Sequence, residues 1–110
     1  HGPEAAEEPS EPGNVVVSLV RSSLAEKCGF VWDAQAVERQ HLRVIDRVSP
    51  GSLAARWNAA HPERAVGAGD ELVGVNGQKG GMEVLSRELS RTGCVVCEFR
   101  PGRLQRGAAP

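Results

Sequence analysis

Short apolar runs of strand length recur along the chain between residues 14 and 100. Residues 42–48 alternate Leu, Val, Ile and Val with Arg and Asp, which is the period-two pattern of a strand with one buried face. The remaining predicted strands are rich in Val or directly follow turn-forming residues. They cover residues 14–20, 30–33, 71–75 and 94–99.

Two segments have the signals of helices instead. Ser52 follows the strand breaker Pro50-Gly51 and is a suitable N-cap for a short helix at 53–59. A longer helix is predicted at residues 82–91, and Gly93 stands at the C′ position just after its end. Its apolar residues Met82, Leu85 and Leu89 are spaced to share one face. The polar segments 34–40 and 61–68 are predicted to be loops.

This order of elements predicts the fold class. The predicted order is three strands, a short helix, a strand, a longer helix and a last strand. This order favours an α+β, mainly β fold. We expect a five- to six-stranded antiparallel β-sandwich, or partly open barrel, capped by two helices. There are too few helices for a doubly wound sheet. Residues 14–100 form the predicted domain, between an acidic, Pro-rich tail at 1–13 and a basic tail at 101–110.

The charge and apolar content exclude several classes of partner. The formal net charge is -1 and the Arg residues are spread along the chain, so we expect no nucleic acid partner. No apolar run reaches the ~20 residues of a membrane span. The chain begins at His1 without an initiator Met, which we interpret as a processed subunit, with an organelle such as a plastid as one compartment, or as an excised fragment.

The three cysteines do not predict a cofactor. Cys94 and Cys97 have the spacing of a metal knuckle, but a zinc site needs four ligands and no second pair exists. Both lie in a Val-rich strand, where positions three apart point to opposite faces. We expect Cys28, Cys94 and Cys97 to be buried free thiols, with a disulfide and a metal site as the weaker alternatives.

No set of residues predicts an enzyme. The histidines are scattered, and no serine lies in a Gly-x-Ser-x-Gly turn. Lys27 beside Cys28 would lower a thiol pKa, but a pocket-lining role fits that position better. We therefore expect no catalytic residue and no small-molecule substrate. A regulatory fragment of a protease stays open as an alternative that would require a further domain.

Three motifs occur in a specific order and spacing. The first is Lys27-Cys28-Gly29-Phe30, the second is the turn into the short helix at 48–55, and the third is Gly-Asp-Glu-Leu-Val-Gly-Val-Asn-Gly at 69–77. Together they resemble the PDZ domain, whose binding loop reads Gly-Leu-Gly-Phe. The resemblance covers about residues 14–100.

The resemblance implies a module that binds proteins. Such domains take the C-terminus of a partner, or an extended segment, as an added strand beside the long helix. The terminal carboxylate would meet the N–H groups of the loop, with Lys27 or Arg21 assisting. The implied peptide-binding residues are Lys27, Cys28, Gly29, Phe30, Val31, Trp32, Met82, Ser86 and Leu89.

The chain departs from the family pattern at three positions. Lys27 replaces the first Gly, so a positive φ there would be costly. Met82 stands at the first position of the helix, where many members carry His, and it favours an apolar residue two positions before the partner's terminus. Trp32 is larger than the aliphatic residue usual at its position, and we expect it to narrow or plug the pocket for the last side chain.

An alternative hypothesis keeps the same fold but assigns the protein another function. The protein would be an accessory subunit of a large assembly, in which the tails and the 56–68 loop contact neighbouring subunits. The candidate interface residues are Trp57, Arg56 and His61, because Trp and Arg are enriched at the centres of interfaces.

Overall fold

The structure is a computed structural model that describes residues 9–102. Within that range the chain forms five strands and two α-helices, which confirms the predicted α+β, mainly β fold. The strands are β1 (Val15–Arg21), β2 (Phe30–Trp32), β3 (Ile45–Val48), β4 (Glu71–Val75) and β5 (Gly93–Arg100). The helices are α2 (Leu53–Ala60) and α3 (Met82–Leu89), with short helical turns η1 (Ala36–Gln40) and η2 (Pro62–Arg64).

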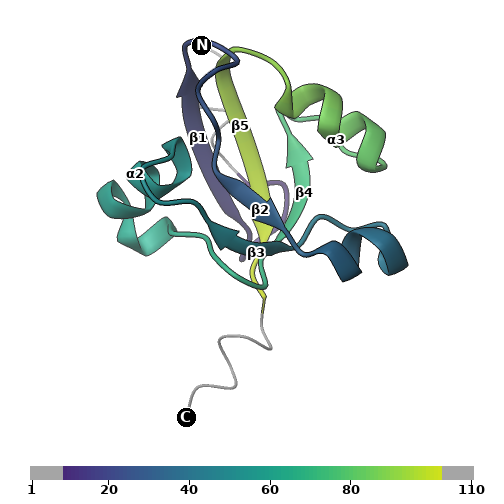
Figure 1. The fold of residues 1–110 in the computed structure, drawn as a ribbon. Helices are drawn as coiled ribbons and strands as arrows, with labels where there is room; N and C mark the ends of the chain where they lie inside the picture. The colour runs from purple at the N-terminus through teal and green to yellow at the C-terminus, as the bar shows by residue number, and fades with distance from the viewer. Residues whose placement is uncertain (1–8, 103–110) are drawn as a thin grey trace.

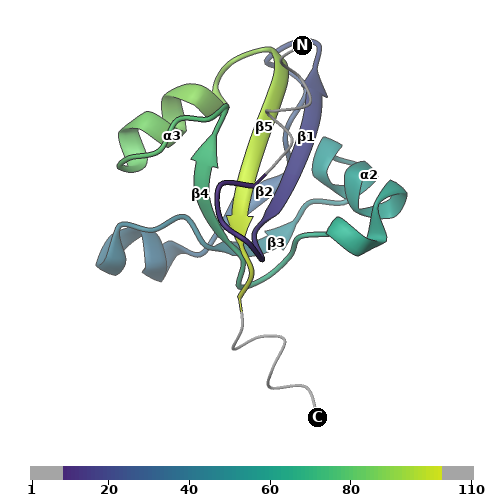
Figure 2. The same ribbon diagram turned by 180° about the vertical axis from the view of Figure 1, so that it is seen from behind.

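The strands form two antiparallel sheets. One has the order β1-β5-β4 and the other pairs β2 with β3. A bridge between Val44 and Glu71 links the two sheets at one corner. Figures 1 and 2 show the β2-β3 pair crossing the face of β1 and β5, with α2 and α3 at opposite sides. The result is the partly open sandwich that the pattern predicts.

The core lies between the two sheets. Val95, Cys97 and Phe99 alternate along β5 and are fully buried, and Val17 and Val75 meet them from the strands on either side. The ring of Phe30 lies 5.1 Å from that of Phe99, between centroids. This contact packs β2 onto the larger sheet, because two aromatic rings at such a distance bury a large apolar area.

Three local predictions are wrong. Residues 34–40 are helical rather than a loop: Asp33 Oδ1 accepts the N–H groups of Gln35 (2.9 Å) and Ala36 (3.2 Å), an N-cap overlooked in the sequence. The helix α3 ends at Leu89, and Gly93, with φ +88°, opens β5 instead of closing the helix. Of the three cysteines predicted to be buried, Cys94 is exposed and Cys28 is only partly buried.

The last part of the predicted N-terminal tail packs on the domain. Ser10 N, Ser10 Oγ and Asn14 Nδ2 all donate to Glu98 Oε2, at 2.9, 2.8 and 2.8 Å. Figure 2 shows this segment crossing β5 before it enters β1. The rest of the two predicted tails, residues 1–8 and 103–110, lies outside the described residues. Among residues 9–102, no helix has the length and apolar character needed to cross a membrane.

Candidate functional site

The loop at residues 27–29 is held by the start of α2. All of its carbonyl groups face that helix, because each accepts a hydrogen bond from the turn or the first helical residues. The bonds are Leu53 N to Lys27 O (3.4 Å), Ala54 N to Cys28 O (2.9 Å) and Ser49 N to Gly29 O (2.8 Å). Ser52, the predicted N-cap, accepts from Ala55 N (3.2 Å) and so completes the helix start.

The amide groups of the same loop are left free on its other side. Within residues 9–102, the N–H groups of Cys28 and Gly29 make no hydrogen bond to the chain. Phe30 faces Val48 at a position without mutual hydrogen bonds, since the adjacent bond joins Ser49 to Gly29, so its own N–H is directed away from β3. Successive amides of this kind form a concave site for an anion.

Gly29 is required for this geometry. Its φ is +103°, and a Cβ atom there would lie 2.0 Å from Ser52 Oγ. A side chain would therefore separate the loop from α2 as well as strain the backbone. Lys27 does not adopt a positive φ, because His41 and Asn76 are the non-Gly residues that do so in the described range. The cost of a positive φ at this position therefore does not arise.

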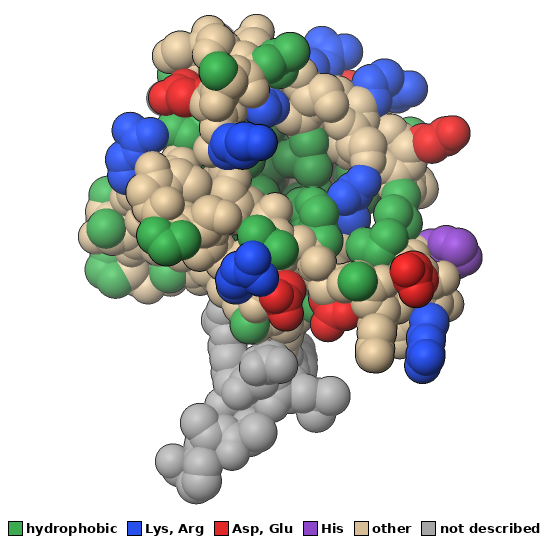
Figure 3. Space-filling model, viewed as in Figure 1, with side chains coloured by type: hydrophobic (Ala, Val, Ile, Leu, Met, Phe, Trp, Pro, Cys, Tyr) green, Lys and Arg blue, Asp and Glu red, His purple; other side chains and the backbone are tan. Residues whose placement is uncertain are grey.

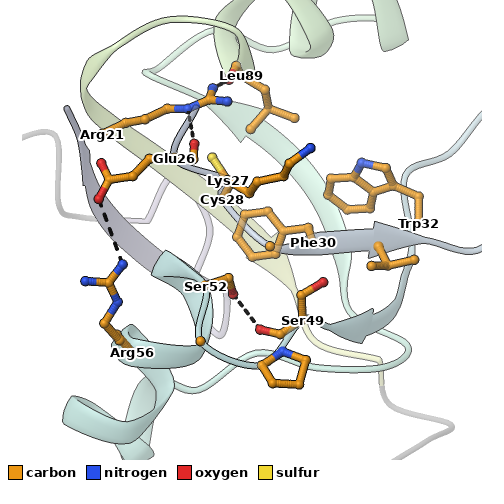
Figure 4. A pocket seen from close by; sticks show the side chains of 14 residues that line it. Arg21, Glu26, Lys27, Cys28, Phe30, Trp32, Ser49, Ser52, Arg56 and Leu89 are labelled. Atoms are coloured by element: carbon orange, nitrogen blue, oxygen red, sulfur yellow. Dashed lines mark hydrogen bonds and ion pairs between the residues drawn. The ribbon is translucent and has the colours of Figure 1, made fainter. Parts of the chain in front are cut away.

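A cavity of about 540 Å³ adjoins the loop. The implied binding residues of the loop, of β2 and of the end of α3 line it together (Figure 4). These are Lys27, Cys28, Gly29, Phe30, Val31, Trp32 and Leu89. Figure 3 shows apolar side chains inside the hollow on this face, with Lys and Arg side chains around it.

Arg21 positions the rim of this cavity. Its guanidinium donates to the backbone carbonyls of Glu26 (2.8 Å), Leu89 (2.7 Å) and Leu24 (3.4 Å), so it ties the turn before the loop to the end of α3. Burial raises the pKa of the Cys28 thiol, and the charge of Arg21 offsets this only in part. Cys28 is therefore a neutral thiol at pH 7 and lines the cavity rather than acting as a thiolate.

Trp32 lines the cavity without filling it. Its ring lies 5.6 Å from that of Phe30, between centroids, and the cavity remains beside both. A bulge between Val31 and Trp32 shifts the pairing with β3, so that Trp32 faces Ile45. The space for a terminal side chain is thus bounded by Phe30, Trp32 and Leu89 rather than closed by the indole.

The other two predicted helix residues lie away from this cavity. Met82 lines a second, smaller cavity of about 140 Å³, together with Leu85 and Leu42. Ser86, on the same helix, accepts a hydrogen bond from Arg43 Nη2. The predicted set is therefore divided along α3, with Leu89 at the loop and Met82 at the far end.

Arg43 is the residue that the sequence analysis missed. It leads into β3, yet its side chain reaches α3 at Ser86 and lies over the ring of Trp32, with 5.5 Å from Cζ to the ring centroid. Its Nε atom is buried and has no hydrogen-bond partner in the described structure. Sequence reasoning treated Arg43 as the polar position of an alternating strand, so no signal linked it to Trp32 or Ser86.

The predicted interface residues have contacts within the chain. Trp57 donates from Nε1 to Arg64 O (3.0 Å) and stacks on His61 at 3.8 Å between ring centroids. Arg56 lies 3.9 Å from Glu26 in an ion pair and also lines the larger cavity. Trp57 also packs against the hydrophobic core and so joins this segment to the body. Residues 56–60 belong to α2 rather than to the predicted loop, and a contact with a neighbouring subunit stays a prediction.

Two further ionisable groups, Asp70 and Cys97, are buried. Asp70 accepts from the backbone N–H groups of Gly67 (2.9 Å) and Gly102 (2.8 Å). Burial strongly raises the pKa of the Cys97 thiol, and all three cysteines are free. Among residues 9–102, no group of three His, Cys, Asp or Glu side chains is arranged to hold a metal ion.

No family model matches the chain, and no curated protein is significantly similar to it.

Proposed function

We propose that this protein is a non-enzymatic interaction module that binds the C-terminal segment of another protein as a strand added to β2. The observation that carries the proposal is the set of unpaired amides at Cys28 and Gly29 beside an open cavity. A carboxylate accepts two or three hydrogen bonds at such a site, and Lys27 and Arg21 add positive charge at its rim.

The open edge of β2 supports the same function. In the described structure β2 pairs only with β3, so its second edge has no strand partner. An unpaired edge presents N–H and C=O groups to any extended chain that reaches it. Main-chain bonds along Phe30 and Trp32 would supply affinity, and the apolar cavity wall at Leu89 would select the last side chain. This is the binding mode of PDZ domains, which the three sequence motifs resemble.

The test compares free and blocked carboxyl ends. Fluorescein-labelled octapeptides from a C-terminal peptide array are titrated by anisotropy, each as the free acid and as the amide. We expect amidation to weaken binding by at least about tenfold, because hydrogen bonds to a charged group contribute roughly 1.5–3 kcal/mol. Amide resonances of residues 28–32 should shift in NMR spectra of the ¹⁵N-labelled protein.

Two helix variants provide the matched control. Leu89→Arg places a charge in the cavity wall and should abolish binding, whereas Glu83→Arg, exposed on the same helix, should not. Thermal melting checks that both variants fold. Equal affinity for acid and amide, shifts confined to other parts of the domain, or an array without any binder would overturn the proposal.

A further inference from the structure

Arg43 lies between Trp32 of β2 and Ser86 of α3, and it lines the smaller of the two cavities. Its guanidinium covers Trp32 on one side and donates to Ser86 Oγ on the other. The ion pairs within residues 9–102 use Arg47, Arg56, Arg91 and Arg100, so this half-buried cation has no carboxylate partner in the described chain. A partly desolvated guanidinium with an unpaired Nε is costly.

A strand added to β2 brings a specific ligand position to Arg43. With the terminal carboxylate at Cys28 and Gly29, the last side chain enters the cavity beside Phe30 and Leu89. Side chains two apart on a strand point to the same face and are separated by about 6.6 Å. The third residue from the end therefore lies level with Trp32, where Arg43 meets Ser86. The penultimate side chain points away from α3.

We propose that Arg43 makes this groove selective for peptides with Asp or Glu two positions before the C-terminus. The inference rests on the proposed function and adds the chemical class of its ligand. The side-chain carboxylate takes the place of Ser86 Oγ as the acceptor for Nη2, and the guanidinium turns so that the second oxygen reaches Nε, which is buried in the free protein. A carboxylate bound side-on to a guanidinium makes two parallel charge-assisted bonds. Trp32 stays as the platform beneath the pair.

A carboxylate fits this position better than the apolar side chain that Met82 alone favours. Burial lowers the pKa of Arg43, which means that its charge is less well solvated than in water. An apolar side chain would cover the guanidinium and increase that cost, whereas an anion would compensate it. Met82 and Arg43 both line the second cavity, and it is the guanidinium of Arg43 that lies over Trp32.

The experiment uses four fluorescein-labelled octapeptides with a common Gly-Ser linker. They end in Glu-Ala-Val, Gln-Ala-Val, Leu-Ala-Val and Ala-Glu-Val. Anisotropy titrations with the wild-type protein should give about tenfold tighter binding for Glu-Ala-Val than for Gln-Ala-Val. The Ala-Glu-Val peptide, whose acid is penultimate, should not share this gain, because its carboxylate points away from Arg43.

Charge variants connect the preference to Arg43. Arg43→Met should bring the affinity ratio between the Glu and Gln peptides to about one. Arg43→Glu should reverse the selection toward a peptide ending in Lys-Ala-Val, an outcome that a merely damaged fold would not produce. Arg47→Met, at an exposed arginine of β3, should keep the wild-type ratio.

The outcomes separate this inference from the function on which it rests. If peptides bind through a free carboxyl end but the wild-type ratio is near one, or persists in Arg43→Met, the selectivity is wrong and the module stands. If none of these peptides, nor any from the array, binds through a free carboxyl end, both proposals fall.

Discussion

The two faces of this domain treat their polar groups in opposite ways. On the β5 face, Glu98 Oε2 accepts three hydrogen bonds from Ser10 and Asn14, and Asn76 pairs with the backbone of Val96 in both directions. On the β2 face, the amides at Cys28 and Gly29 and the Nε of Arg43 have no hydrogen-bond partner among residues 9–102. The first arrangement is typical of structure that is complete in itself, and the second of a site that another molecule completes.

The largest expected effect is on the reaction rates of the three thiols, which lie in different environments. Cys94 is exposed on β5, Cys28 lines the open cavity, and Cys97 is fully buried. Because Cys97 reacts only after unfolding, we expect iodoacetamide to modify it at least about 1,000-fold more slowly than Cys94. Mass spectrometry of timed samples at pH 8 measures the order Cys94, Cys28, Cys97. Equal rates for Cys28 and Cys97 would contradict an open β2 face.

The next effect is on the loop that carries the free amides. Gly29→Ala should lower the free energy of unfolding by about 3 kcal/mol, since strain at a positive φ adds to the overlap with Ser52. Urea denaturation measures it. Gly51→Ala is the control, because Gly51 has φ +75° with open space around it and should cost about 1 kcal/mol. A similar cost at both positions would show that the contact with α2 does not hold the loop.

A smaller loss is expected on the closed face. Asn76 has φ +53°, and its side chain accepts from Val96 N (2.8 Å) and donates to Glu88 (3.3 Å). Asn76→Ala should cost about 2 kcal/mol, because it removes these bonds and keeps a side chain at a positive φ. Asn76→Gly should cost less, since it relieves the backbone part. Urea denaturation of both variants checks this order, and equal costs would assign the whole loss to the hydrogen bonds.

The smallest effect is the pH dependence of the docked N-terminal segment. Burial alone would raise the pKa of Glu98, but bonds from Asn14 and Ser10, with the charge of Lys79, outweigh burial and lower it. A lowered carboxyl pKa stabilises the fold above the unfolded-state pKa and loses that contribution as the pH falls through the folded value. The gain of wild type over Glu98→Gln should be at most about 1 kcal/mol at pH 7.

Unfolding measured at steps from pH 7 down to pH 3 tests this sign. The difference between wild type and Glu98→Gln should shrink steadily toward the acid end. A difference that grows on acidification would mean that Glu98 is stabilised in its neutral form.

Local patterns predicted the elements of this fold well. The segment 71–75 matches β4, and Ser52 caps α2 as expected. The role of the amides in the loop at 27–29 was expected from its resemblance to the PDZ binding loop. The helical turn after Asp33 was missed because the polar composition of 34–40 suggested a loop and outweighed the capping signal of Asp33. Such errors arise where two local signals compete.

The alternation of apolar and polar residues predicted on which face of its strand Arg43 lies, but not which residues its side chain contacts. The strand periodicity, the cap and the Gly that lets a loop approach a helix are properties of neighbouring residues, so they could be predicted from the chain itself. The meeting of Arg43 with Trp32 and Ser86 depends on how β2, β3 and α3 pack, because a long flexible side chain goes where the surrounding elements leave room. Only the packed fold places between β2 and α3 a cation that has no counter-ion in the described part of the chain, and the expected preference for an acidic ligand follows from this.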